Sequence, residues 1–80
     1  MDLKTLITVD TDILGGQPVF SGTRVPVETL FDHLEAGVSL DAFLDDFPTV
    51  TKAQAVAVLA AANKFLTARN AEQLVAAAAR

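Results

Sequence analysis

The sequence contains no cysteine, a single histidine and no long apolar segment. Without cysteine the chain can form no disulfide, no thiolate metal site and no cysteine nucleophile, as is usual in a reducing compartment. No segment reaches the roughly 18 consecutive apolar residues of a membrane helix, and the N-terminus has no apolar signal-peptide core. We therefore expect a soluble, cytoplasmic protein with no membrane partner.

Groups that could carry out catalysis are also scarce. His33 is the only histidine, and no nucleophile or acid stands at a spacing that would make it catalytic or metal-binding. We interpret His33 as a surface or core-edge residue. Asp10 and Asp12 bracket a turn, where aspartates bond to nearby backbone amides more often than to a metal ion. The sequence therefore predicts no enzyme, no catalytic residue, no metal and no cofactor.

Size and charge restrict the kinds of partner. Eighty residues form one small domain, and much of the 51% hydrophobic content is alanine, which buries little area. We therefore expect a homodimer or a permanent partner. Residues 1–50 carry two basic and nine acidic residues, whereas residues 51–80 carry four basic and one acidic. The basic second part mildly favours a nucleic-acid or acidic-partner surface, and chance clustering on a solvated surface fits it equally well.

Turn-forming residues concentrate in the first third of the chain. A short strand is predicted over residues 6–9, where apolar and β-branched residues follow one another. Val19-Phe20 and Thr23-Arg24 flank Ser21-Gly22, which is the arrangement of a tight two-residue β-hairpin. Residues 1–26 are thus predicted to form a strand and a hairpin that must rest on helices, because a two-stranded ribbon is marginal alone.

Helical periodicity follows Pro26, which lacks a backbone N–H and is tolerated only in the first turn of a helix. Residues 27–36 and 40–47 each repeat apolar residues at helical spacing. Gly37 stands where a left-handed C-terminal cap is expected, and Ser39 stands at the N-cap position of the second helix. The sequence therefore predicts two short helices separated by a tight connection.

The third helix is predicted to be the longest. It begins at Thr51, which forms a capping box with Gln54, and it extends to about Thr67. Its predicted buried side comprises Ala55, Val58, Leu59, Ala62, Phe65 and Leu66. The predicted fold is mainly α, with a helix-turn-helix-like three-helix core over residues 27–67, the short N-terminal β-hairpin, and a C-terminal helical tail over residues 68–80.

The second and third helices with the turn between them resemble a helix-turn-helix unit, a geometry also common in proteins that do not bind DNA. The third helix begins with polar residues, where a recognition helix places its base contacts. The candidate DNA contacts are Thr51, Lys52, Gln54 and Lys64. Because the rest of the helix is rich in alanine and poor in cations, specific binding would need a dimer or a basic partner.

Arg24 is the only cation between Lys4 and Lys52. Its forked guanidinium suits a structural bond to a carboxylate or to helix-terminal carbonyls, which is the interpretation we favour. The alternative is a contact to a phosphate or to the acid of a partner. Gly15-Gly16 lack the spacing of a phosphate-binding loop, so we expect no nucleotide site there.

A glycine-proline-arginine frame runs through three segments, namely Leu14-Gly15-Gly16-Gln17-Pro18-Val19, Gly22-Thr23-Arg24-Val25-Pro26-Val27 and Leu34-Glu35-Ala36-Gly37-Val38-Ser39. Phe47-Pro48, Thr51 and an alanine-rich helix follow. In these residues the sequence resembles the small bacterial family of domain of unknown function 433, which is VapB antitoxin-like. The resemblance implies a helix-turn-helix-like domain that binds and silences a neighbouring PIN-type nuclease toxin and represses its own promoter. Gln17 stands where a lysine is frequent, which removes a cation near the hairpin.

Neutralisation of a toxin is expected to use the C-terminal segment, which could fold into a groove of the partner. The candidate partner-binding residues are Arg69, Leu74, Val75 and Arg80. Two other functions fit the sequence, a stand-alone helix-turn-helix transcriptional regulator and a dimeric assembly module that does not bind DNA. A regulator predicts DNA affinity that falls steeply with salt, whereas an assembly module predicts self-association without any shift of a promoter fragment.

Overall fold

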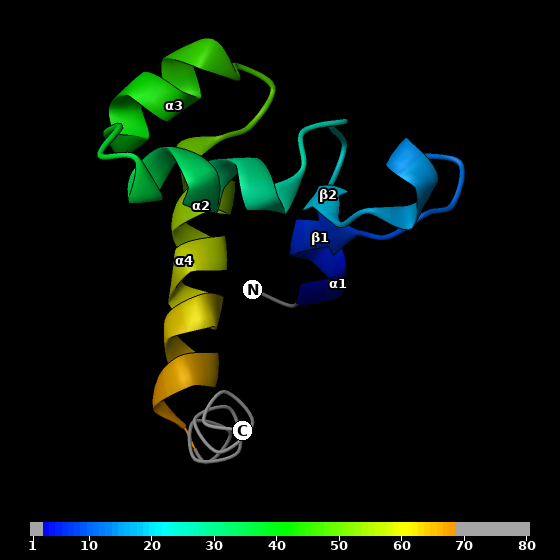
Figure 1. The fold of residues 1–80 in the computed structure, drawn as a ribbon. Coiled ribbons are helices and arrows are strands. Elements are labelled where there is room, and N and C mark those ends of the chain that lie inside the picture. Colours follow the sequence, from blue (N-terminus) through cyan, green and yellow to red (C-terminus); the bar gives the residue numbers. More distant parts are fainter. Residues whose placement is uncertain (1–2, 69–80) are drawn as a thin grey trace, which may run out of the picture.

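The computed structural model describes residues 3–68 and consists mainly of helices around a short antiparallel ribbon (Figure 1). This confirms the predicted fold class. The elements in chain order are α1 (Leu3–Leu6), β1 (Ile7–Thr8), the 3-10 turn η1 (Leu14–Gly16), β2 (Val19–Phe20), α2 (Val27–Glu35), α3 (Leu40–Asp46) and α4 (Lys52–Thr67). The helical tail was predicted over residues 68–80, and all of it except residue 68 lies outside the described residues.

The core collects one or two apolar side chains from nearly every element. Its buried members are Leu6, Phe20, Leu30, Phe43, Val50, Ala55 and Val58. The rings of Phe20 and Phe43 lie 6.4 Å apart between centroids, which joins the ribbon to the helices. Figure 1 shows α2 and α3 across one end of α4 and the ribbon beside α2, while α1 packs against α4. The ribbon therefore rests on helices, as its small size requires.

The N-terminal ribbon differs from the predicted hairpin. Residues 3–6 are helical, and the remaining short strand pairs with β2 in the register Ile7↔Phe20 and Thr8↔Val19. Thr23-Arg24 do not pair with β2, because the Phe20 amide donates to the Val25 carbonyl at 3.0 Å. The two-residue hairpin is therefore wrong, and the loop comprises residues 21–24.

The side chain of Thr23 explains the longer loop. Its hydroxyl donates to the Phe20 carbonyl at 2.8 Å and accepts from the Val25 amide at 3.0 Å. Threonine hydroxyls compete in this way with strand pairing. Gly22 takes φ +77°, and the Thr23 amide donates to the Phe20 carbonyl at 3.0 Å, so a tight turn does form at Ser21-Gly22.

The helix boundaries agree closely with the local signals. Gly37 has φ +82° and donates to the Leu34 carbonyl at 3.0 Å, while Val38 donates to the His33 carbonyl at 2.9 Å. These two bonds form a Schellman motif that ends α2. Ser39 caps α3 through the Ala42 amide, and Thr51 with Gln54 forms the capping box of α4. The predicted caps are therefore confirmed.

The C-terminal half of α4 does not have the predicted burial. Ala55 and Val58 are buried, but Phe65 is 49% exposed and Leu66 is 59% exposed. The prediction that these two side chains are buried is wrong, because no other described element reaches this end of the helix (Figure 1). None of the described helices has the length and apolar content needed to span a membrane.

Candidate functional site

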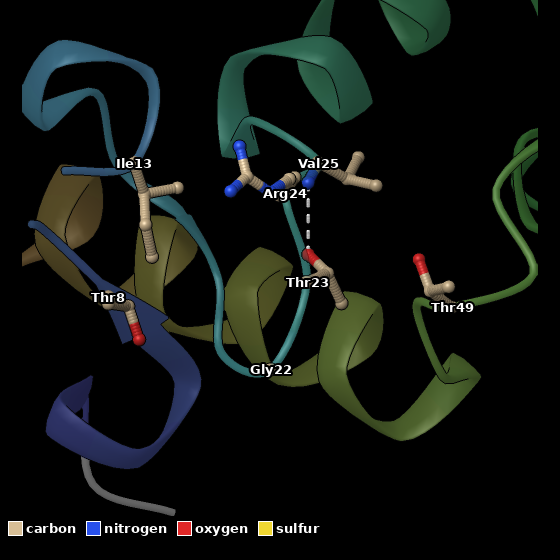
Figure 2. A pocket seen from close by; sticks show the side chains of 7 residues that line it. All are labelled: Thr8, Ile13, Gly22, Thr23, Arg24, Val25 and Thr49. Carbon is tan, nitrogen blue, oxygen red and sulfur yellow. Dashed lines mark hydrogen bonds between the residues drawn. The ribbon is translucent and has the colours of Figure 1, made fainter.

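A groove of about 550 Å³ lies beside residues 21–25, which we call the 21–25 turn (Figure 2). We call this groove the Arg24 groove. Three separate parts of the chain meet there: the end of β1 with the loop that follows it, the turn itself, and the connection between α3 and α4. The lining residues are Thr8, Ile13, Gly22, Thr23, Arg24, Val25 and Thr49. In Figure 2, Thr8 and Ile13 lie on one side of the turn and Thr49 lies on the other.

Local hydrogen bonds fix the loop that carries Ile13. The Asp12 amide donates to Asp10 Oδ1 at 2.8 Å, and the Ile13 amide donates to the Asp10 carbonyl at 2.9 Å. This is the turn chemistry expected of these aspartates. Residues 3–68 contain no group of three or more side chains suited to hold a metal ion. Ile13 thus contributes an apolar wall, which the sequence reasoning did not identify.

Arg24 places an exposed guanidinium at this groove. The backbone on either side is held by Thr23, because its hydroxyl accepts the Val25 amide. Within residues 3–68 the Arg24 side chain has no hydrogen bond and no ion pair, so the structural bond that we favoured has no partner in this part of the chain. The other interpretation, a contact to an external anion, stays open as a prediction.

Some hydroxyl groups of the groove make hydrogen bonds to other described residues, and one does not. Thr23 is engaged as described, and Thr8 Oγ1 lies 3.1 Å from Ser21 Oγ in a hydrogen bond. The Thr49 hydroxyl makes no hydrogen bond to another described residue. A guanidinium beside an aliphatic wall suits a carboxylate or phosphate that is flanked by apolar groups. The Thr49 hydroxyl lies on the other side of the turn from this guanidinium (Figure 2). No signal in the sequence places Thr49 at the same groove as Arg24, because this arrangement results from the tertiary fold.

The side-chain amide of Gln54, a candidate DNA contact, makes hydrogen bonds within the domain through both its oxygen and its nitrogen. Its Oε1 accepts from the Thr51 amide at 3.0 Å, and its Nε2 donates to the Ser21 carbonyl at 2.9 Å. The second bond ties the 21–25 turn to the first turn of α4 across 33 residues. Gln54 therefore supports the groove, and its role as a DNA contact stays a prediction.

The other candidate DNA contacts are exposed on α4. Thr51 and Lys52 lie at its N-terminal end, and Lys64 lies in its last turns. Twelve residues separate the two lysines, which corresponds to about 18 Å along the helix axis and about 120° around it. The two cations therefore do not share one face of the helix. The candidate partner-binding residues Arg69, Leu74, Val75 and Arg80 lie outside the described residues.

His33 lies at the edge of the core. Its Nδ1 is hydrogen-bonded to the Thr29 carbonyl at 2.7 Å. Its ring meets Phe43 and Phe47 edge-on, at centroid distances of 5.4 and 5.5 Å. These contacts account for the side chain structurally and agree with the core-edge interpretation.

The comparisons with known proteins point to one family. The sequence pattern of a family described as "Protein of unknown function (DUF433)" matches residues 7–62. A crystal structure of a DUF433 member protein from Anabaena variabilis ATCC 29413 is similar, with a TM-score of 0.66 and 26% identity. That similarity covers 98% of this chain and 72% of the other.

A relative is also found among curated proteins. The uncharacterized protein y4eO of Sinorhizobium fredii (strain NBRC 101917 / NGR234) is 40% identical over 47 residues. The aligned part is 59% of this chain but only 21% of the relative, so the chain corresponds to about a fifth of that protein. The structural similarity extends over the ribbon and helices, and neither protein's description assigns an activity.

Proposed function

The chain belongs to the DUF433 family, and we propose that it is a binding protein, an antitoxin-like domain that neutralises a PIN-type nuclease. The observation that supports this proposal is the Arg24 guanidinium, which is exposed at an apolar-walled groove and unbonded within residues 3–68. Nucleases of this type, which the family resemblance implies as partners, carry clustered carboxylates. A guanidinium fork is a matching cation for such a cluster.

The rigidity of the turn favours this role for Arg24. Thr23 holds the backbone before and after Arg24, and Gln54 holds the turn to α4. A side chain on a fixed backbone loses less freedom on binding than one on a mobile loop. Arg24 would pair with a carboxylate of the nuclease, while Ile13 and Val25 would contact neighbouring apolar side chains. Through that pairing the domain would cover the nuclease site and block access of RNA.

The proposal is tested by co-expression with the product of the adjacent gene, followed by affinity capture and mass determination of the complex. Arg24→Gln should weaken the complex by about 10- to 100-fold, because a hydrogen bond to a charged group contributes about 1.5–3 kcal/mol. Lys64→Gln is the matched control, since it removes an exposed cation that does not line the groove. Recovery of the bare protein, or equal weakening by both variants, would contradict the proposal.

Operator DNA is a second candidate ligand. The observation that favours it is the exposure of Thr51 and Lys52 at the start of α4, the second helix of the helix-turn-helix-like unit. Asp45 and Asp46 are also exposed, at the end of α3, and would repel nearby phosphates. Fluorescence anisotropy with a promoter fragment tests this idea. Lys52→Ala with Lys64→Ala should lower affinity and flatten its salt dependence, and unchanged binding would rule out this surface.

Binding to DNA without any nuclease partner would instead support a stand-alone regulator. Binding to neither, together with stable self-association, would support the assembly module. The co-expression and anisotropy measurements therefore separate the three functions that fit the sequence.

A further inference from the structure

Leu14 is held in a backbone conformation that leucine rarely adopts. Its φ is +49°, and it begins a run of positive φ that continues with Gly15 at +67° and Gly16 at +93°. In the left-handed region a Cβ crowds the following carbonyl oxygen, a cost that glycine avoids. Within residues 3–68, Leu14 is the one residue other than glycine with positive φ. The chain therefore carries a leucine at a position where glycine would be unstrained.

The core does not use this side chain. Leu14 is 47% exposed, and among the described residues it is neither part of the core nor one of the half-buried side chains that pack against it. Other groups fix the loop, since the Ile13 amide donates to the Asp10 carbonyl at 2.9 Å and the Gly16 amide donates to the Ile13 carbonyl at 3.1 Å. Strained residues of this kind cluster at binding sites. The strain at Leu14 therefore indicates a contact outside the domain.

Leu14 stands next to the wall of the Arg24 groove. It directly follows Ile13, which lines the groove, and neighbouring Cα atoms are about 3.8 Å apart. In Figure 2 the guanidinium of Arg24 extends toward the Ile13 side of the turn. We propose that Leu14 is a second contact residue of this groove, and that it packs against an apolar side chain of the partner beside the carboxylate that pairs with Arg24.

The chemistry of the two residues together defines the occupant. Arg24 has no ion pair or hydrogen bond within residues 3–68 and matches an external carboxylate, whereas the exposed Leu14 matches an apolar group. A nuclease that carries an apolar side chain beside its carboxylates offers both, so this inference rests on the proposed function. A second copy that paired through the same face would instead bring a second guanidinium to the groove. Leu14 would thus distinguish between nucleases whose carboxylates are alike.

Affinity of full-chain variants for the product of the adjacent gene tests the inference. Leu14→Asn removes the apolar side chain but keeps a residue that tolerates positive φ, so it should weaken the complex by about tenfold or more through the loss of one buried leucine. Leu14→Met keeps the apolar volume and should retain most of the affinity. Val56→Asn is the matched control, because Val56 is also 47% exposed but does not line the groove. Its complex should be as tight as that of the wild type.

Thermal unfolding of the same variants separates a role in binding from a role in the fold. Leu14→Asn should unfold at the temperature of the wild type or slightly above it, because asparagine relieves the strain. A midpoint lowered by more than about 3 °C would show that the fold uses Leu14 and would overturn the inference.

The outcomes also distinguish this inference from the proposed function. If Arg24→Gln weakens the complex but Leu14→Asn does not, the inference is overturned and the proposed function stands. If the wild type forms no complex, both are overturned. Sedimentation velocity without the nuclease covers the remaining occupant, since a wild-type dimer that Leu14→Asn dissociates would assign this surface to a second copy and overturn the inference.

Discussion

The turn region, residues 7–26, and the helical region, residues 27–67, are stabilised in different ways. The strands of the turn region are two residues long, and side-chain hydroxyls close its loop through bonds of 2.8–3.1 Å. The helical region relies on caps and apolar stripes that recur at helical spacing. The turn region therefore relies on side-chain hydrogen bonds for its shape, whereas the helical region carries local boundary signals such as the caps at Gly37, Ser39 and Thr51.

The core phenylalanines should show the largest effect, because they join the two regions. Phe43 is fully buried and meets both Phe20 and Phe47. Phe43→Ala should lower the free energy of unfolding by about 3–5 kcal/mol, the usual effect of truncating a buried aromatic side chain. Urea denaturation monitored by circular dichroism measures this effect. Phe65→Ala is the control on the exposed side and should change the stability of the monomer by less than about 1 kcal/mol.

Removal of the hydrogen bond from Gln54 to Ser21, which joins the two regions, should have the next largest effect on the free energy of unfolding. Gln54→Ala leaves the Ser21 carbonyl and the Thr51 amide without their partner, which should cost about 1–3 kcal/mol. Gln17→Ala is the control, since its exposed 3.3 Å bond to Glu28 should contribute less than about 0.5 kcal/mol. Thermal unfolding of both variants compares the two glutamines. Equal effects would mean that the regions are not connected through Gln54.

Gly22 in the turn region and Gly37 in the helical region allow a direct comparison of the two regions. Gly22 and Gly37 have φ of +77° and +82°, and an added Cβ would meet no atom within 4 Å at either position. Substitution by alanine should therefore cost about 1–2 kcal/mol in both cases, from backbone strain alone. Only Gly22→Ala should also weaken capture of the nuclease, because Gly22 lines the Arg24 groove. Loss of capture in both variants would indicate a general effect of stability.

The smallest expected effect concerns charges at the ends of α3. Asp46 lies in the last turn, where the helix dipole disfavours an anion, and Asp41 lies in the first turn, where it is favoured. Asp46→Asn should stabilise the protein by about 0.3–0.5 kcal/mol, and Asp41→Asn should destabilise it by a similar amount at low salt. Denaturation at low and high salt measures both changes. The same sign for both variants would show that the dipole does not determine them.

The helical region was more predictable from the sequence than the turn region. The helix boundaries and caps of the helical region were predictable, because Ser39, Thr51 and Gly37 act on residues within a few positions. The register of the ribbon was not, since the Thr23 hydroxyl replaced strand pairing with a longer loop. Periodicity placed Phe65 and Leu66 on the correct face of α4, but it cannot show whether the chain reaches far enough to cover them.

The candidate site was only partly predictable for a related reason. Arg24 stood out as an isolated cation in the sequence, and the structure exposes it. Ile13 and Thr49 gave no comparable signal, because their position beside Arg24 results from the packing of three distant segments. Gln54 was recognised as a cap, but its second bond to Ser21 depends on tertiary structure.

The Gln54–Ser21 bond also joins two parts of the chain that are far apart in the sequence. It closes a loop of 33 residues that contains α2 and α3, and the conformational entropy of closing such a loop must be overcome before the bond forms. The helices consist of local contacts and can form first. We therefore expect the bond between the 21–25 turn and α4 to form after the helices, so a chain that ends before Gln54 would lack the support that α4 gives to this turn.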